Sequence, residues 1–127
     1  MLLLRNFTCA LLLTAPLAVN AHHSAVFNYS EETITLEGTV TEVKWVNPHG
    51  SLVLEVVNED GTTDEWLVEF LARIALERQG FDFDALQTGL DIKITGRIGF
   101  REGYLRFREA ELEDGRIIRE RNPTLEQ

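Results

Sequence analysis

Three histidines are the side chains in this chain best suited to metal chemistry. His22 and His23 are adjacent near the N-terminus, and His49 lies within the segment Trp45-Val46-Asn47-Pro48-His49-Gly50. A histidine that begins a chain offers two nitrogen ligands, its α-amine and its ring Nδ1. One further imidazole completes a T-shaped three-nitrogen site, which suits Cu(II). We therefore predict a metal site built from His22 and His49, with His23 as a competing ligand.

Such a site forms only if the chain is cut directly before His22. Residues 1–21 have the pattern of a secretory signal peptide, with Arg5 as the only charged side chain and an apolar run from Phe7 to Leu13. The run is shorter than the roughly 20 apolar residues that span a bilayer. Val19-Asn20-Ala21 provides the small residues that signal peptidase accepts. We predict cleavage after Ala21, and a retained N-terminal helix is the alternative.

The remaining residues favour Cu(II), with Zn(II) as the less favoured ion. Cys9 and Met1, the only cysteine and the only methionine, both fall within the predicted signal, so soft Cu(I) ligands are absent from the mature chain. A nitrogen site or a mixed nitrogen and oxygen site remains, and Glu31 or Glu32 could supply an oxygen. A competing interpretation is that the N-terminal histidines are solvated and that His49 only hydrogen-bonds across its turn.

Composition limits the classes of protein and partner. Cleavage leaves 127 − 21 = 106 residues, the size of one domain, which must fold around an apolar core without disulfides. Since Arg5 is removed, the mature chain has 11 basic and 21 acidic residues and a net charge of −10. An acidic domain repels phosphate backbones and anionic lipid, so we expect neither nucleic acid as a partner nor membrane anchoring of the mature form.

The pattern of apolar residues predicts mostly strands. We expect an irregular arm over residues 22–32 and then a long strand, Thr33–Val46, whose alternation changes phase beside Gly38, which is typical of a bulge. One helix is expected over Leu71–Gln79, with Leu71, Ile74, Ala75 and Arg78 on one face and Gly80 at its C-terminus. The other expected strands are Ser51–Val57, Asp64–Phe70, Leu90–Phe100 and Tyr104–Leu112.

This order of elements predicts a fold. Three strands, one short helix and two further strands, with a kinked first strand, are typical of a small five-stranded OB-like Greek-key barrel. A half-open antiparallel sandwich is the alternative. We assign residues 33–120 to this domain, and residues 121–127 to a C-terminal tail.

A second group of residues could form a surface for a ligand or a partner protein. Trp45 and Trp66 are expected in or at the mouth of the barrel, beside the turn that holds Asn47. Arg106 and Arg108 alternate along one strand and would form a basic ridge, or a solvated face paired with nearby glutamates. These residues support an alternative function, a metal-free interaction module.

The sequence gives little support to enzymatic function. Ser24 has no arrangement of base and orienting residue around it, so a hydrolytic triad is not indicated. Asp82 and Asp84 are expected to anchor the loop after the helix rather than to act as an acid and base pair. The chain also lacks a phosphate-binding glycine loop. Redox catalysis at a copper site is a minor hypothesis.

Several segments together resemble a family of small exported bacterial proteins, the domain of unknown function DUF6152. They include His22-His23-Ser24, Tyr29, Gly38-Thr39-Val40-Thr41, the Asn47-Pro48-His49 segment, Trp66, Glu69, Arg78-Gln79-Gly80, Thr95-Gly96 and Asp114-Gly115-Arg116. The chain departs from the family pattern at Phe70-Leu71-Ala72, where a proline is usual, and at Phe81, where tryptophan is frequent. The resemblance implies a periplasmic location but no activity.

The sequence thus predicts a periplasmic protein that binds a metal ion, most of all copper, for sequestration, delivery or sensing. The rival hypothesis is a metal-free module that binds a periplasmic partner protein or a small ligand.

Overall fold

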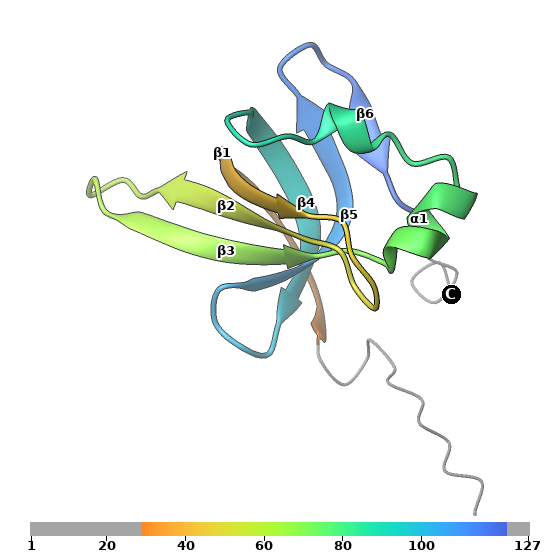
Figure 1. Cartoon of the computed structure of the whole chain (residues 1–127). Helices are drawn as coiled ribbons and strands as arrows, with labels where there is room; N and C mark the ends of the chain where they lie inside the picture. The colour runs from red at the N-terminus through yellow and green to blue at the C-terminus, as the bar shows by residue number, and fades with distance from the viewer. Residues whose placement is uncertain (1–28, 122–127) are drawn as a thin grey trace, which may run out of the picture.

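The computed structural model describes residues 29–121, which form a mostly β domain with one short α-helix, as predicted (Figure 1). In chain order its elements are β1 (Tyr29–Lys44), β2 (Ser51–Val57), β3 (Thr63–Glu69), α1 (Arg73–Arg78), the 3-10 turn η2 (Phe83–Ala85), β4 (Asp91–Gly99), β5 (Tyr104–Leu112) and β6 (Ile117–Arg119). None of the helices within residues 29–121 is long and apolar enough to cross a membrane.

The five long strands pair in a closed circuit. β1 lies between β2 and β4, β2 pairs with β3, and β4 pairs with β5, all antiparallel. A parallel pairing from Leu67–Tyr104 to Glu69–Arg106 joins β3 to β5 and completes the circuit. This is the strand order of the OB-like fold that the sequence predicts. The expected count of five strands was one too few, because Ile117 and Ile118 form part of a sixth strand against the end of β5.

β1 is bent, as the change of phase near Gly38 predicts. Its register against β2 shifts between Val40 and Glu42. At Gly38 the two strands approach so closely that a Cβ atom would collide with the carbonyl oxygen of Glu55. Glycine is therefore required where β1 crosses β2.

The start of β1 differs from the prediction. The strand begins at Tyr29 rather than Thr33, so residues 29–32 belong to β1 and not to an irregular arm. Tyr29 pairs with Gly99 of β4, and the register is irregular between Tyr29 and Thr33. Arg97 explains the difference, because its Nε donates to the carbonyl oxygen of Ser30 (2.7 Å) and its Nη2 contacts Glu31 Oε1 (3.0 Å). The predicted signal peptide, residues 22–28 and residues 122–127 lie outside the described part of the chain.

The core joins the inner faces of the strands to the segments that follow β3. Phe70 and Phe107 are fully buried and stack with ring centroids 4.2 Å apart. Trp45 packs edge-on against Phe70 (5.0 Å) and Phe83 (5.2 Å), so it closes one end of the core. Each such buried side chain stabilises the fold by about 1.5–3 kcal/mol, which replaces any need for disulfides.

α1 is shorter than predicted and buries a different face. It begins at Arg73, and its buried side chain is Leu76, while Ile74 is 49% exposed. The reason is that Leu71 is held in an extended segment, with its carbonyl oxygen accepting from Gly50 N (3.0 Å). The first helical turn is therefore displaced and the buried face rotates. Gly80 has a φ of +69°, as expected for a residue that ends a helix.

Candidate functional site

The turn that carries His49 is anchored to the chain after β3. Gly50 N donates to Leu71 O (3.0 Å), and Phe70 N donates to Gly50 O (2.8 Å). The side chain of Asn47 accepts from Ile74 N (3.3 Å) and so ties the turn to the start of α1. These contacts come from both sides of the turn. They therefore fix the backbone of the turn at His49.

The imidazole of His49 engages the protein through one nitrogen. Its Nδ1 lies 3.3 Å from the carbonyl oxygen of Phe70 and 3.5 Å from Oε1 of Glu69. Among the described residues Nε2 makes no hydrogen bond, and the side chain is 54% exposed. Two oxygen atoms facing Nδ1 favour the tautomer with its proton on that atom, which leaves the lone pair of Nε2 facing away from both oxygens.

A buried tyrosine from the beginning of β1 lies near Glu69. Tyr29 is 4% exposed. Burial raises the pKa of Tyr29 well above its ordinary value, and the negative charge of Glu69 raises it further. The hydroxyl therefore stays protonated at neutral pH. Residues 29 and 49, which are far apart in sequence, thus both lie near the Glu69 carboxylate.

A buried ion pair lies beside this carboxylate. Nη2 of Arg106 contacts Oε1 of Glu120 at 2.5 Å, and both side chains are almost fully buried. Arg106 Nη1 also donates to the carbonyl oxygen of Glu69 (2.7 Å), and Glu120 Oε2 accepts from Leu71 N (2.9 Å). Burial raises the pKa of Glu120, and the charge of Arg106 opposes this shift. We refer to Tyr29, His49, Glu69, Arg106 and Glu120 as the His49 cluster.

Comparison with known proteins identifies a family and one similar solved structure. The model of DUF6152, a family of unknown function, matches residues 10–104, three quarters of the chain. The chain belongs to the DUF6152 family. No curated protein matches it. Among solved structures it is similar to the dimeric N-terminal domain of PriB protein from Thermoanaerobacter tencongensis, with 20% identity, a TM-score of 0.47, and coverage of 65% of this chain and 97% of that one.

The structure of this DUF6152 member describes one of the three predicted metal ligands. His22 and His23 lie outside the described residues, whereas His49 stands on the anchored turn with its ring half exposed. Within residues 29–121 no group of three histidine, cysteine, aspartate or glutamate side chains is close enough to hold a metal ion.

The aromatic and amide members of the predicted partner surface have structural roles. Trp45 packs among aromatic rings, and Trp66 is partly buried against the core. Asn47 accepts a hydrogen bond from the first turn of α1.

The predicted basic ridge is not formed. Arg106 is 3% exposed and paired with Glu120, while Arg108 is exposed. The physical reason is an irregularity in the β4–β5 pairing, where Thr95 faces Glu109 but Gly96 faces Phe107. Arg108 has no register partner at this bulge, so the two arginines no longer share one face.

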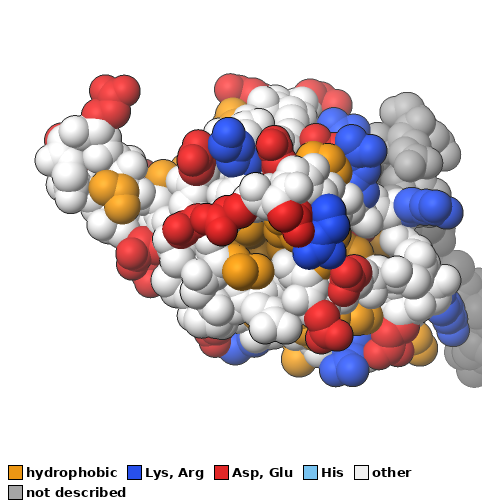
Figure 2. Space-filling model, turned by 90° about the horizontal axis from the view of Figure 1, so that it is seen from above, with side chains coloured by type: hydrophobic (Ala, Val, Ile, Leu, Met, Phe, Trp, Pro, Cys, Tyr) orange, Lys and Arg blue, Asp and Glu red, His pale blue; other side chains and the backbone are white. Residues whose placement is uncertain are grey.

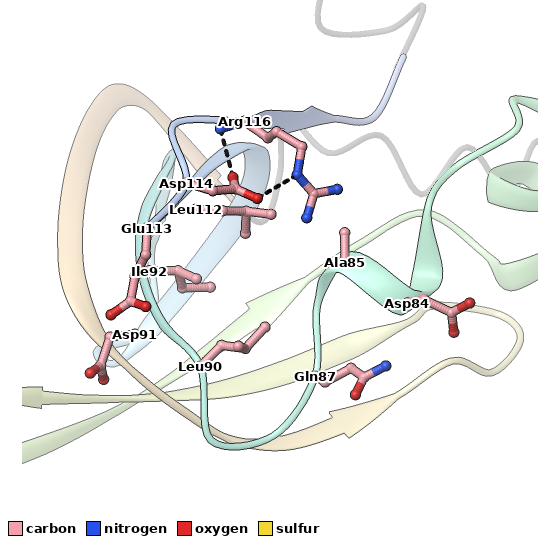
Figure 3. A pocket seen from close by; sticks show the side chains of 10 residues that line it. All are labelled: Asp84, Ala85, Gln87, Leu90, Asp91, Ile92, Leu112, Glu113, Asp114 and Arg116. Atoms are coloured by element: carbon pink, nitrogen blue, oxygen red, sulfur yellow. Dashed lines mark hydrogen bonds and ion pairs between the residues drawn. The ribbon is translucent and has the colours of Figure 1, made fainter.

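A second candidate region, the acidic cavity, lies where β4 begins and β5 ends (Figure 3). It has a volume of about 280 Å³ and is lined by Asp84, Ala85, Gln87, Leu90, Asp91, Ile92, Leu112, Glu113, Asp114 and Arg116. Ile92 and Leu112 are buried at its floor, and its carboxylates are exposed. Arg116 Nε contacts Asp114 Oδ2 at 2.7 Å. The cavity offers oxygen ligands and no nitrogen ligand.

Acidic and basic side chains are mixed on the surface. The face seen in Figure 2 carries them close together, with hydrophobic side chains visible between them. Asp82, expected to anchor the loop after α1, accepts a hydrogen bond from Ala85 N (3.2 Å) at the start of η2.

Sequence analysis did not place Tyr29 and Glu69 beside His49. The alternation of polar and apolar residues around each of them predicts only a strand. No local pattern in the sequence indicates which residues lie side by side once the sheet has closed. The one signal available was the resemblance to DUF6152, since Tyr29, His49 and Glu69 are all among the residues that carry it.

Proposed function

We propose that this protein is a periplasmic Cu(II)-binding protein that sequesters, delivers or senses the ion. The α-amine and ring of His22 and the Nε2 atom of His49 would supply three nitrogen ligands, with His23 as a further ligand. The observation that carries the proposal is the state of the His49 ring, which is held through Nδ1 and open at Nε2.

This geometry is what a metal-binding histidine needs. Such a histidine coordinates through one nitrogen and donates the N–H of the other to a carboxylate or a carbonyl oxygen, which fixes the tautomer and the direction of the ring. His49 has both kinds of acceptor at Nδ1, from Glu69 and Phe70. Its anchored turn also removes much of the ordering entropy that a flexible ligand would lose on binding.

The length of the N-terminal segment is sufficient for the same site. Seven residues, 22–28, precede Tyr29. Fully extended, a segment of seven residues reaches roughly 23–25 Å. The path from the Tyr29 backbone to the His49 ring crosses only one tyrosine side chain and one carboxylate, that of Glu69. Covalent geometry therefore permits His22 to reach His49.

The donor set favours Cu(II) over Zn(II). Copper(II) prefers tetragonal nitrogen sites, which a chelating N-terminal histidine and one imidazole complete in a plane. Structural zinc sites need four tetrahedral ligands, and the described residues offer only Glu69 beside His49. Bound Cu(II) would be held for transfer or storage, since a three-nitrogen planar site leaves positions open to exchange.

The test is calorimetric titration of the mature protein, beginning at His22, with Cu(II) and with Zn(II). We expect one Cu(II) per chain and a loss of affinity of at least about a hundredfold in His49→Ala, because a chelating ligand is removed. One extra glycine before His22 should produce a similar loss, since it moves the amine out of chelating reach. His23→Ala distinguishes the competing ligand. Electron paramagnetic resonance should show nitrogen ligands that disappear with His49.

Weak binding that neither the added glycine nor His49→Ala changes would contradict the proposal. The alternative, a metal-free module for a partner protein or small ligand, would then take its place. Val46 and Ile74 would be the first surface to test, because they are 48% and 49% exposed and lie on segments that are hydrogen-bonded beside the His49 turn.

A further inference from the structure

We propose that Glu69 is the positioning residue of the His49 site. The inference rests on the copper function proposed above and deepens it. It assigns the carboxylate a role through His49 and not a place among the metal ligands.

The backbone of Glu69 is fixed on three sides. It is the last residue of β3, where it is paired in register with Ser51 of β2 and with Arg106 of β5. Arg106 also donates from Nη1 to the Glu69 carbonyl oxygen (2.7 Å). The side chain thus starts from a rigid point and is only 29% exposed.

The Glu69 carboxylate acts on His49 differently from the Phe70 carbonyl. The carbonyl oxygen, 3.3 Å from Nδ1, is a neutral acceptor and carries no charge that could bias the tautomer strongly. Oε1 of Glu69, 3.5 Å from the same atom, adds a negative charge that increases the electron density donated by Nε2. Removing this charge while keeping the shape should weaken a metal bond at Nε2 without removing the ligand.

Glu69→Gln is the matched variant, because it keeps an oxygen acceptor and the size of the side chain. Glu65→Gln is the control, since Glu65 lies on the same strand with an exposed side chain. Tyr29→Phe removes only the hydroxyl of a buried tyrosine near Glu69 and tests whether that hydroxyl affects the site. Circular dichroism melts of all four proteins establish that each is folded before binding is compared.

Two measurements are made on each protein. Nitrogen NMR of the metal-free protein reports the tautomer of His49, and titration with CuCl₂ reports affinity. We expect the Nδ1–H tautomer in the wild type and in Glu65→Gln, and a mixture of tautomers in Glu69→Gln. Copper affinity should fall about 10–100-fold in Glu69→Gln, and less in Tyr29→Phe, with an unchanged set of nitrogen ligands in the resonance spectrum.

The outcomes separate the inference from the function on which it rests. Copper binding and a His49 tautomer that are both unchanged in Glu69→Gln would overturn the inference and leave the copper site intact. A changed ligand set would also overturn it, because Glu69 would then be a ligand itself. A wild type that binds no copper, with a tautomer that still depends on Glu69, would refute the copper function and leave the effect of Glu69 on His49 standing.

Discussion

Charged side chains are arranged differently at the two ends of β5. Near its start, Arg106 is buried against Glu120 and donates to Glu69, so each charge in the His49 cluster has a partner at a fixed distance. Near its end, the acidic cavity gathers carboxylates that remain in water (Figure 3). The His49 cluster holds its side-chain atoms in fixed directions, whereas the acidic cavity only brings negative charges together.

The difference matters for metal binding. A coordinating atom must be held in one direction, and Nε2 of His49 is so held because Nδ1 faces Phe70 and Glu69. The exposed carboxylates of the acidic cavity are solvated, and one of them, Asp114, is already paired with Arg116 at 2.7 Å. Order, rather than the number of anionic groups, distinguishes the candidate site from the rest of an acidic surface.

The largest effect should come from breaking the buried pair. Glu120→Ala leaves the Arg106 guanidinium buried without its anion, which should lower the free energy of unfolding by about 3–5 kcal/mol. Urea denaturation followed by tryptophan fluorescence measures this loss. Glu120→Gln, which retains an acceptor for Leu71 N, should lose less. Equal stability of wild type and Glu120→Ala would show that the pair is not buried as described.

The pH dependence of stability should have opposite signs in the two regions. The folded pKa of Glu120 is raised by burial above its ordinary value of 4.5. The part of its stabilisation that depends on its bound proton is therefore fully present below that value and is lost as pH rises through the folded pKa. Hydrogen bonds from Arg116 lower the pKa of Asp114, so its contribution is present above 3.8 and is lost as pH falls.

Urea denaturation at a series of pH values from about 3 to 8 tests both signs. The stability difference between wild type and Glu120→Gln should decrease as pH rises from the lower limit. The corresponding difference for Asp114→Asn should increase over the acidic part of the series. Parallel curves for the two variants would contradict the assignment of one buried and one exposed carboxylate.

The sequence predicts the elements whose signals are local. β2 and β5 have the predicted bounds, because each alternates cleanly and is enclosed by turn residues such as Gly50 and Gly103. Gly80 marks the end of α1 for the same reason. The start of β1 was missed because Arg97, 67 residues further along the chain, holds Ser30 in place through the side chain. The displaced start of α1 likewise depends on a long-range contact, between Leu71 and Gly50.

The candidate site was predictable only in its histidine. His49 could be singled out because its type and its turn are visible in the sequence. Tyr29 and Glu69 join it through the closure of the sheet, which brings the ends of β1 and β3 to the same part of β5. Arg106 was assigned to a surface ridge because strict alternation takes no account of the bulge opposite Gly96.

Ionisation of Tyr29 provides a more selective test of the cluster. Its raised pKa means that the folded protein keeps this phenol protonated above the ordinary value of 10, so stability from Tyr29 is intact below pH 10 and is lost as pH rises further. Tyrosinate absorbance, compared between wild type and Tyr29→Phe, isolates this group from Tyr104. Removing the Glu69 charge, in Glu69→Gln, should move the transition to lower pH. Ionisation of Tyr29 at its ordinary pKa would show that neither burial nor Glu69 acts on its hydroxyl.

The smallest effect should come from the acidic cavity. Glu113 lies on its exposed rim, where water already solvates the carboxylate, so Glu113→Gln should change the free energy of unfolding by less than about 0.5 kcal/mol. It should also leave the Cu(II) affinity of the mature protein unchanged, because the cavity contributes no ligand to the proposed site. Calorimetric titration of both Glu113→Gln and His49→Ala with Cu(II) compares their affinities directly. A copper affinity that falls with Glu113→Gln as it does with His49→Ala would place the metal among solvated carboxylates, and the orientation of His49 by Glu69 would then have no bearing on binding.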